Sequence, residues 1–100
     1  MEVKITKQDN ATVVELTGRL DTPASQEVAI AFQPLMEAAA GTIILDCSGL
    51  TYISSSGLRI FLSLRKAAAT KGGKVIVKNI CDSIRQVFMM TGFLTLFEIE

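Results

Sequence analysis

The chain begins with an alternation of apolar and polar residues that predicts a β-hairpin. Val3 and Ile5 alternate with polar neighbours, which indicates a half-buried strand. A turn at Gln8–Ala11 separates this strand from a second run of strand-forming residues, Thr12–Thr17. We therefore expect the chain to open with two antiparallel strands.

The next segment has the pattern of a helix. Thr22 offers a capping hydroxyl and Pro23 suits the first helical position, so the helix should begin here. Pro34 lacks a backbone donor and should kink or break the helix near residues 32 and 33. Gly41 should close the element. Apolar residues recur at helical spacing at Val28, Phe32, Leu35, Met36 and Ala39.

Two short apolar runs predict buried strands. Thr42–Asp46 and Lys74–Val77 are nearly unbroken apolar segments, as in strands that are covered on both faces. Between them we expect a loop over Cys47–Ile53 and then a second helix from about Ser55 to Lys71, which stops at the Gly pair 72–73.

The C-terminal part should contain a third helix and a last strand. Asp82 or Ser83 is expected to cap this helix, and Gly92 to end it. Leu96–Ile99 reads as the last strand.

This order of elements predicts an α/β fold in a single domain over residues 1–100. Alternation of strands and helices implies right-handed crossovers and a mostly parallel sheet. We expect a mixed sheet of about five strands with three main helices, in which the opening hairpin adds one antiparallel strand.

Composition and charge narrow the range of functions. Ten basic residues balance ten acidic ones, so the net charge gives no attraction toward nucleic acid or an anionic membrane. Between residues 47 and 81 the chain nevertheless carries six basic residues and no acidic one. That stretch is either a solvated helix and strand end or an anion-binding surface.

Several chemistries lack the residues that they need. The chain has no His, which excludes a Ser-His-Asp triad, and it has no phosphate-binding glycine loop. Cys47 and Cys81 are not spaced as metal ligands and should be small buried thiols of a reducing compartment. We therefore expect no metal and no cofactor, and the residues support none of these enzyme classes.

The chain shows no targeting or membrane segment. Its first ten residues lack the apolar core of a signal peptide, and no run approaches the ~18 apolar residues of a membrane span. We expect a cytoplasmic protein without a membrane span.

Three consecutive serines, Ser54–Ser56, precede the second helix. If Ser54 is the cap, Ile53 and Leu58 occupy the positions of a hydrophobic staple, which the choice of Ser55 would not allow. Ser55 is then the first helical residue, with a free hydroxyl at a helix end that stabilises anions. Gly57 should leave the backbone open to close approach. From the residues alone, the triplet is either a polar turn or a phosphate-carrying site.

The second helix should turn one face to the sheet and one to solvent. Leu58 and Leu62 fall on a flank between these faces. They could form either a contact patch for a partner or part of a wide core face. The face toward the sheet comprises Gly57, Ile60, Phe61, Leu64 and Ala68, and the opposite face Arg59, Ser63, Lys66 and Thr70.

Asp46 ends the first buried strand, where receiver domains carry an aspartyl phosphoacceptor. Such a site also needs an acidic pair after the first strand to hold a divalent cation, and only Asp9 is available here. We expect Asp46 instead to accept backbone N–H groups of its own loop.

The segment Leu45–Arg59, LDCSGLTYISSSGLR, resembles the signature of STAS domains, the anti-sigma factor antagonist family. That signature is an apolar strand ending in Asp, a Ser two residues later, an aromatic–apolar pair and an Asp-Ser-Ser-Gly-Leu-like turn into a helix. Ser54 stands where the signature has Asp. The matching residues are Asp46, Ser48, Tyr52, Ile53, Ser55, Ser56, Gly57 and Leu58.

The resemblance implies a binding switch rather than an enzyme. In its unphosphorylated form such a protein binds a serine-kinase anti-sigma factor and so frees a sigma factor. Phosphorylation, here of Ser55, dissolves the complex, and a serine phosphatase of the PP2C type reverses it. Beside this site we expect Ser54 to cap the helix, Asp46 and Ser48 to order the loop, and the free protein to be a monomer. The partner-binding residues should be Ser56, Gly57, Leu58, Arg59 and Leu62.

A second interpretation is a STAS domain without a phosphorylation switch. It would be a scaffold or interaction subunit of a larger assembly, such as a signalling complex or a lipid-transport ATPase. Phosphate on Ser55 in cells distinguishes the two interpretations.

Overall fold

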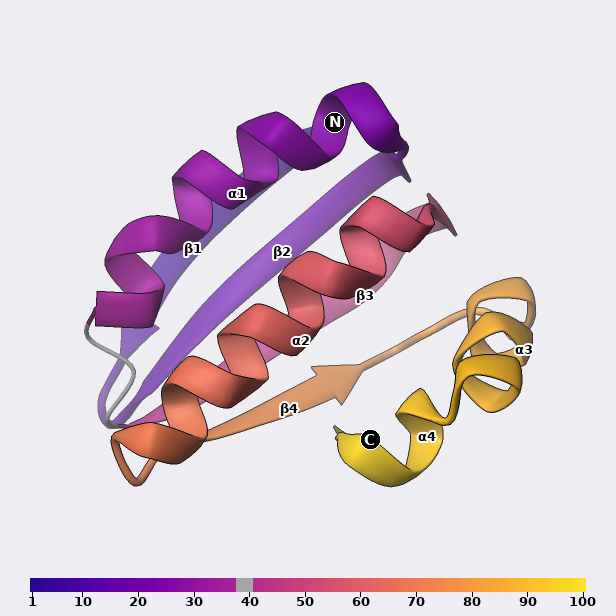
Figure 1. The fold of residues 1–100 in the computed structure, drawn as a ribbon. Helices are drawn as coiled ribbons and strands as arrows, with labels where there is room; N and C mark the ends of the chain where they lie inside the picture. The colour runs from indigo at the N-terminus through magenta and orange to yellow at the C-terminus, as the bar shows by residue number, and fades with distance from the viewer. Residues whose placement is uncertain (38–40) are drawn as a thin grey trace.

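The computed structural model describes residues 1–37 and 41–100, which form five strands and four helices (Figure 1). Ala39, which the sequence assigned to the first helix, lies outside the described residues. In chain order the elements are β1 (Glu2–Gln8), β2 (Ala11–Leu20), α1 (Thr22–Glu37), β3 (Thr42–Ile53), α2 (Ser55–Thr70), β4 (Lys74–Lys78), α3 (Asp82–Thr91), α4 (Phe93–Leu96) and β5 (Glu98–Ile99).

The five strands form one sheet in the order β1-β2-β3-β4-β5. β1 is antiparallel to β2, and each later strand is parallel to the one before it. α1 and α2 lie side by side on one face of this sheet (Figure 1). The mixed, mostly parallel α/β sheet and its opening hairpin are therefore confirmed.

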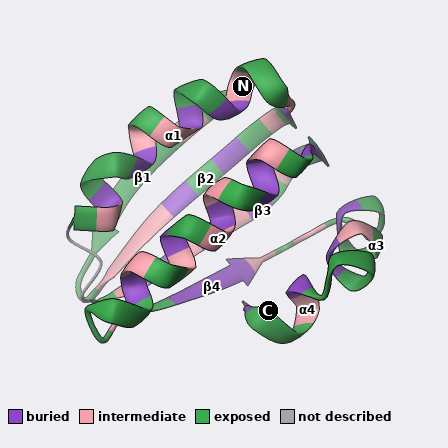
Figure 2. Ribbon diagram, viewed as in Figure 1, coloured by how far each residue is buried: buried purple, intermediate pink, exposed green. Residues whose placement is uncertain are grey.

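The hydrophobic core lies between the sheet and the two long helices. Alternate residues of β2 and β3, such as Val14 and Leu45, are fully buried beneath the helices. Buried and exposed stretches alternate along α1 and α2, as in helices that pack on one side only (Figure 2).

The C-terminal elements close one end of this core. α3 and α4 lie beyond β4, away from α1 (Figure 1). A cluster of aromatic rings joins α2 to the C-terminal segment, with ring centroids 5.4 to 6.5 Å apart. The cluster consists of Phe61, Phe88, Phe93 and Phe97.

Two details of α1 differ from the sequence-based expectation. Asp21 caps the helix instead of Thr22, because its Oδ1 accepts the N–H of Ala24 at 3.0 Å. The helix also continues through Pro34 to Glu37, so of the kink or break expected near residues 32 and 33, the break did not occur. Packing of Phe32 and Leu35 in the core outweighs the one missing backbone hydrogen bond.

β3 is longer than its apolar run. The predicted loop over residues 47–53 is strand, because β2 extends beside it as far as Leu20 and provides pairing partners. The register between the two strands shifts twice along this stretch, at Glu15/Thr17 and at Gly18/Arg19. Gly18 accommodates its bend with a φ of 108°.

The C-terminal third departs from expectation in three places. Cys81, not Asp82 or Ser83, occupies the cap position of α3, and its side chain makes no capping hydrogen bond. Residues 93–96 form the short helix α4, so the last strand is only Glu98–Ile99. Gly92 ends α3 in the left-handed conformation, with a φ of 81°, as expected.

The expectation of two buried thiols is correct for Cys47 and wrong for Cys81. Cys47 is fully buried, and burial raises the pKa of its thiol to about 12. Cys81 is exposed at the start of α3. A hydrogen bond with the Ser83 hydroxyl, 3.2 Å away, and the backbone N–H of Ile84 lower the pKa of Cys81.

Candidate functional site

Ser54 lies between β3 and α2 in the chain, and its hydrogen bonds connect the end of β2 to the start of α2. Its backbone N–H donates to the carbonyl oxygen of Leu20 at 2.8 Å, and its Oγ accepts the N–H of Gly57 at 3.1 Å. The extended backbone of Ser54, with φ −86° and ψ 170°, is that of an N-cap. The predicted cap is therefore confirmed, and Ser54 itself is only 8% exposed.

Ser55 is the first residue of α2, and its side chain is exposed. Because Ser54 already supplies the cap, the Ser55 hydroxyl is not needed to satisfy the helix end. The free N–H groups of the first turn and the helix dipole surround it with a partial positive charge. A phosphate on this oxygen would be placed favourably with respect to the helix.

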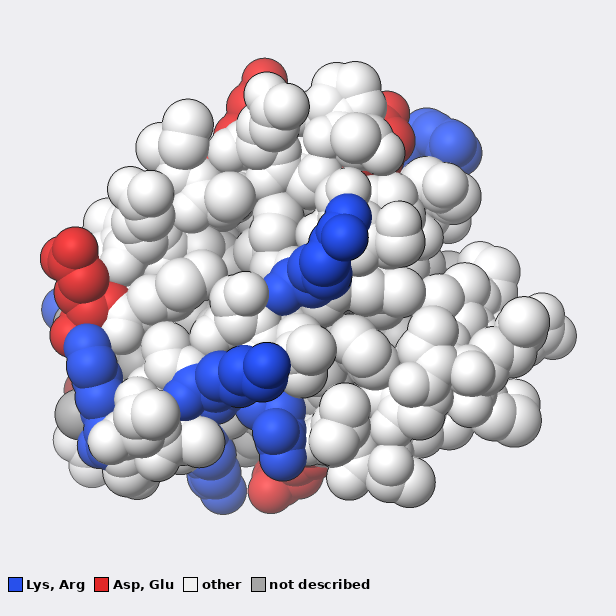
Figure 3. All heavy atoms as spheres, viewed as in Figure 1, with Lys and Arg blue, Asp and Glu red and all other residues white. Residues whose placement is uncertain are grey.

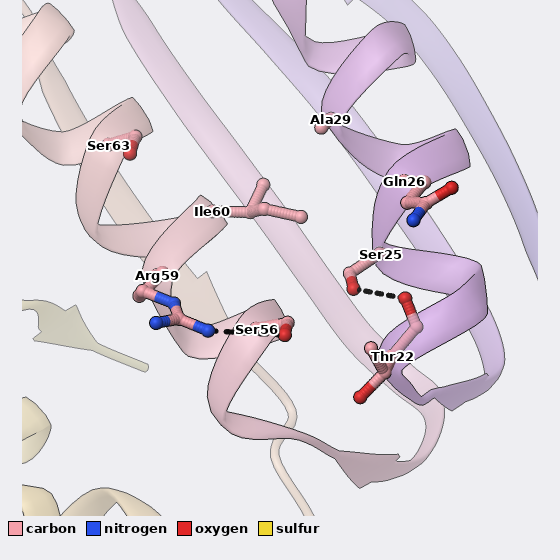
Figure 4. A pocket seen from close by; sticks show the side chains of 8 residues that line it. All are labelled: Thr22, Ser25, Gln26, Ala29, Ser56, Arg59, Ile60 and Ser63. Atoms are coloured by element: carbon pink, nitrogen blue, oxygen red, sulfur yellow. Dashed lines mark hydrogen bonds between the residues drawn. The ribbon is translucent and has the colours of Figure 1, made fainter.

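Ser56 and Arg59 line a hollow of about 330 Å³ between the N-terminal halves of α1 and α2 (Figure 4). Arg59 donates from Nη2 to the Oγ of Ser56 at 3.3 Å. Figure 4 shows Ile60 pointing from α2 toward α1 across this hollow. The rest of the lining consists of Ser63 from α2 and, from α1, Thr22, Ser25, Gln26 and Ala29.

Gly57 and Leu58 belong to the interior. A Cβ at Gly57 would lie 2.7 Å from Cγ of Leu20, so the close approach that we expected here is made by the chain's own β2. Leu58 is 8% exposed and part of the core cluster, as the wide core face requires. Both residues can affect a partner only by holding the start of α2 in place.

Leu62 lies between the interior and the surface. It is half-buried and packs against the core, which leaves part of its side chain accessible. The opposite face of α2 is exposed as expected, at Arg59, Ser63, Lys66 and Thr70. The accessible surface next to Ser55 is thus made mainly by polar and basic residues.

Asp46 lies within β3, beside the last residue of β4, and accepts two hydrogen bonds there. Its Oδ1 accepts the backbone N–H of Ser48 at 3.0 Å, as expected, and the Nδ2 of Asn79 at 3.2 Å. Partial burial acts to raise the pKa of Asp46, but these hydrogen bonds and the nearby charge of Lys78 lower it overall. Asp46 therefore ties β3 to the segment after β4.

Sequence reasoning missed two residues of this region. Asn79 has a left-handed backbone, with a φ of 63°, and no local pattern connects it to Asp46. The guanidinium of Arg19 lies over the ring of Tyr52, 4.3 Å from its centroid. Only the register of β2 with β3, which pairs these two residues, could have indicated that contact.

Basic side chains dominate the helical face of the molecule around α2 (Figure 3). Asp and Glu lie toward the margins of the same view. The stretch between residues 47 and 81 supplies Arg59, Arg65 and Lys66 from α2 itself. Acidic groups on a partner that binds here would be attracted to these basic side chains.

The described residues offer few features of other kinds. No helix among residues 1–37 and 41–100 is long and apolar enough to span a membrane. Within the same residues, no group of His, Cys, Asp or Glu side chains is placed to hold a metal ion.

Comparison with known proteins gives consistent results. The family model "STAS domain" matches residues 2–100. A putative anti-sigma factor antagonist of Bordetella bronchiseptica, BtrV, is 25% identical over 99% of this chain and 85% of its own length. The anti-sigma-B factor antagonist of Staphylococcus aureus is 23% identical over 100% of this chain and 93% of its own length.

A solved structure has the same fold. It is the Bacillus cell fate determinant SpoIIAA in its phosphorylated form, with a TM-score of 0.77 and 22% identity over 99% of this chain and 91% of that one.

Proposed function

The chain belongs to the STAS domain family, and we propose that it is an anti-sigma factor antagonist that phosphorylation of Ser55 switches off. In its unphosphorylated form it binds a serine-kinase anti-sigma factor and thereby frees a sigma factor. It acts as a binding protein in the cytoplasm rather than as an enzyme. A serine phosphatase of the PP2C type restores the active form.

The observation that carries this proposal is the exposed hydroxyl of Ser55 at the first position of α2. A kinase must place the acceptor oxygen next to the γ-phosphate of ATP, and Ser55 offers that oxygen without unfolding of the helix. Ser54 remains the cap, so modification of Ser55 removes no hydrogen bond of the fold. The names of the two curated relatives and the phosphorylated form of SpoIIAA support the same interpretation.

The proposed partner surface surrounds this hydroxyl. Ser56, Arg59 and the accessible part of Leu62 form it directly. Gly57 and Leu58 support it from inside. Asp46 and Ser48 do not order a loop beside it, because both lie within β3, where the Asp46 carboxylate accepts the Ser48 N–H.

Release of the partner follows from charge and bulk at the interface. A phosphoserine adds about 1.5 to 2 negative charges. Binding would then have to desolvate these charges or bring them against the acidic groups that the basic surface of α2 attracts. The affinity falls although the fold of the free protein is unchanged.

Phosphate mapping with the purified proteins tests the proposal. The chain is incubated with ATP and the serine-kinase anti-sigma factor of the same organism, and peptides are analysed by mass spectrometry. We expect one phosphate, on Ser55, and none on Ser55→Ala. Ser63→Ala is the matched control, because Ser63 is an exposed serine of the same helix, and this variant should still be modified.

Calorimetry of the two forms completes the test. The phosphorylated chain should bind the kinase at least about tenfold more weakly, which corresponds to ~1.4 kcal/mol. Phosphate on Ser54 or Ser56 would contradict the assignment of the acceptor. Equal binding of both forms would instead favour the scaffold without a switch.

A further inference from the structure

β1 is an open edge of the sheet. It pairs with β2 on one side only, so the backbone N–H and C=O groups of its other side have no partner in the sheet. The opposite edge, β5, is two residues long, whereas β1 has seven. A strand of this length can pair with another extended strand.

The helical layer stops short of this edge. Ile5 is opposite Val14 in the β1–β2 register and therefore lies on the same face of the sheet. Val14 is fully buried, but Ile5 is 42% exposed. Beside Ile5 lies a hollow of about 340 Å³ whose lining includes Ala31, Pro34 and Leu35 of α1. Apolar surface is thus accessible along the open edge.

We infer that β1 pairs antiparallel with β1 of a second copy of this chain, in a register centred on Ile5. Ile5 is the middle residue of Glu2–Gln8, so this register pairs all seven residues and brings the two Ile5 side chains together. It satisfies the two-fold symmetry of a homodimer. The sequence had led us to expect a monomer.

The positions of the charged residues favour this register over the two neighbouring registers, which are centred on Lys4 and on Thr6. Like charges directly opposite each other on paired strands are destabilising. A register centred on Lys4 would place two Lys4 side chains directly opposite each other, and one centred on Thr6 would oppose Ile5 with Lys7. Centred on Ile5, the register places Lys4 opposite Thr6 and Lys7 opposite Val3.

The same register brings opposite charges together across the interface. α1 returns from the end of β2 and therefore runs in the same direction as β1. Glu27 precedes Ala31 by one helical turn on the same flank, at the i, i+4 spacing. Four helical residues rise about 6 Å, and two strand residues span about 7 Å. Ala31 and Ile5 line the same hollow, so this spacing places Glu27 at about the level of Val3, opposite which the second copy carries Lys7.

Lys7 and Glu27 are available for this contact. The ion pairs within the described residues are Lys74–Glu98 and Lys78–Glu100, so neither Lys7 nor Glu27 is engaged in one. By symmetry the dimer contains two Lys7–Glu27 pairs. The pairing leaves the start of α2 uncovered, since Ser55 follows β3 and not the edge strand. Both copies would remain open to a partner.

Sedimentation equilibrium over a concentration series to about 1 mM tests the inference. The mean mass should rise from that of the 10.8 kDa chain toward twice this value. Lys7→Glu and Glu27→Lys should each weaken dimerisation by roughly tenfold, because each places like charges together. The double variant should recover dimerisation, since the exchanged charges attract again.

Two controls separate the edge from other surfaces. Lys66→Glu makes the same charge change on the exposed face of α2 and should leave dimerisation unchanged. Ser55→Asp should also leave it unchanged, which makes this result independent of the proposed switch. A mass that stays at 10.8 kDa throughout the series would overturn the inference. So would a double variant that is no better than the single ones, or a Lys66→Glu variant as weak as Lys7→Glu.

Discussion

Gly57 occupies a position of α2 that has no room for a side chain. A Cβ there would meet Cγ of Leu20 at 2.7 Å and Cγ1 of Ile53 at 3.0 Å, and Leu20 is fully buried. Overpacking of this kind costs about 1–3 kcal/mol, and Ala recovers up to ~1 kcal/mol through its helix propensity. The absence of a side chain lets α2 pack closely on β2 at its first turn.

We predict that Gly57→Ala lowers the free energy of unfolding by about 1–2 kcal/mol. The reason is the displacement of Leu20, and urea denaturation measures it. Ser63→Ala, at an exposed position of the same helix, should change stability by less than ~0.5 kcal/mol. Equal stability of Gly57→Ala and the unchanged chain would show that β2 and α2 can separate freely at this point.

Asn79 should control the titration of Asp46. Removal of its side chain in Asn79→Gly, which tolerates the φ of 63°, should move the pKa of Asp46 back toward 3.8. Because the folded-state pKa is lowered, Asp46 stabilises the fold above about pH 4, and this contribution disappears as pH falls through the folded-state pKa. An NMR titration of the carboxyl carbon measures the shift.

The stability of the same variant supplies the control. Asn79→Gly should destabilise the chain more at pH 7 than at pH 2. The hydrogen bond that this variant removes stabilises Asp46 only in its ionised form. In the background Asp46→Asn the effect of Asn79→Gly should no longer depend on pH in this range. If the effect of Asn79→Gly still depended on pH in the Asp46→Asn background, a titratable group other than Asp46 would be responsible.

At the scale of elements, the start of α2 depends on one capping hydroxyl. Ser54→Ala should lower the free energy of unfolding by about 1 kcal/mol, because the N–H of Gly57 loses its acceptor. Ser54→Asp should retain the stability, since a carboxylate caps equally well and interacts favourably with the helix dipole. Urea midpoints compare the three proteins. If Asp is as harmful as Ala, burial of the carboxylate outweighs its capping.

Phosphorylation of Ser55 should leave α2 intact. At a helix N-terminus the added charge is stabilised by roughly 0.3–1 kcal/mol, and Arg59 lies four residues later, within reach of the phosphate. We predict equal or higher urea midpoints for the phosphorylated chain and unchanged amide spectra outside the first turn. Arg59→Ala should reduce any gain in stability.

A different outcome would point to a different mechanism of release. If phosphorylation melted α2 or cost more than ~1 kcal/mol, the partner would be lost through local unfolding instead of charge at the interface. Ser55→Asp should reproduce the release only in part, because it carries less charge in a different shape.

At the scale of the whole molecule, the net charge is zero but the charged residues are distributed unevenly. The basic groups of α2 gather on the helical face (Figure 3). We predict that Arg59→Glu weakens binding of the anti-sigma factor by about tenfold and makes it less sensitive to salt. Lys4→Glu makes the same change on β1 and should have little effect. Calorimetry at low and high salt compares the variants, and an equal loss for both would indicate only a long-range effect of net charge.

The sequence by itself determined the features that neighbouring residues decide. Alternation along β1 and β2 and the helical spacing in α2 predicted these elements, because each side chain only has to match the period of its own segment. Ser54 was identified as the cap in the same way, from the positions of Ile53 and Leu58. The family motif pointed to Ser55, since its residues are contiguous.

Only the tertiary structure decided the features that depend on residues far apart in the chain. β3 extends to Ile53 because β2 lies beside it, and α1 passes through Pro34 because its core contacts outweigh the lost hydrogen bond. The exposed edge at Ile5 is not visible in the local pattern. Helical spacing placed Gly57 on the face toward the sheet, but only the tertiary structure shows that Leu20 leaves no room for a side chain there. Hydrophobic periodicity predicts which side of an element is apolar. Tertiary packing decides which other element buries that side, and to what extent.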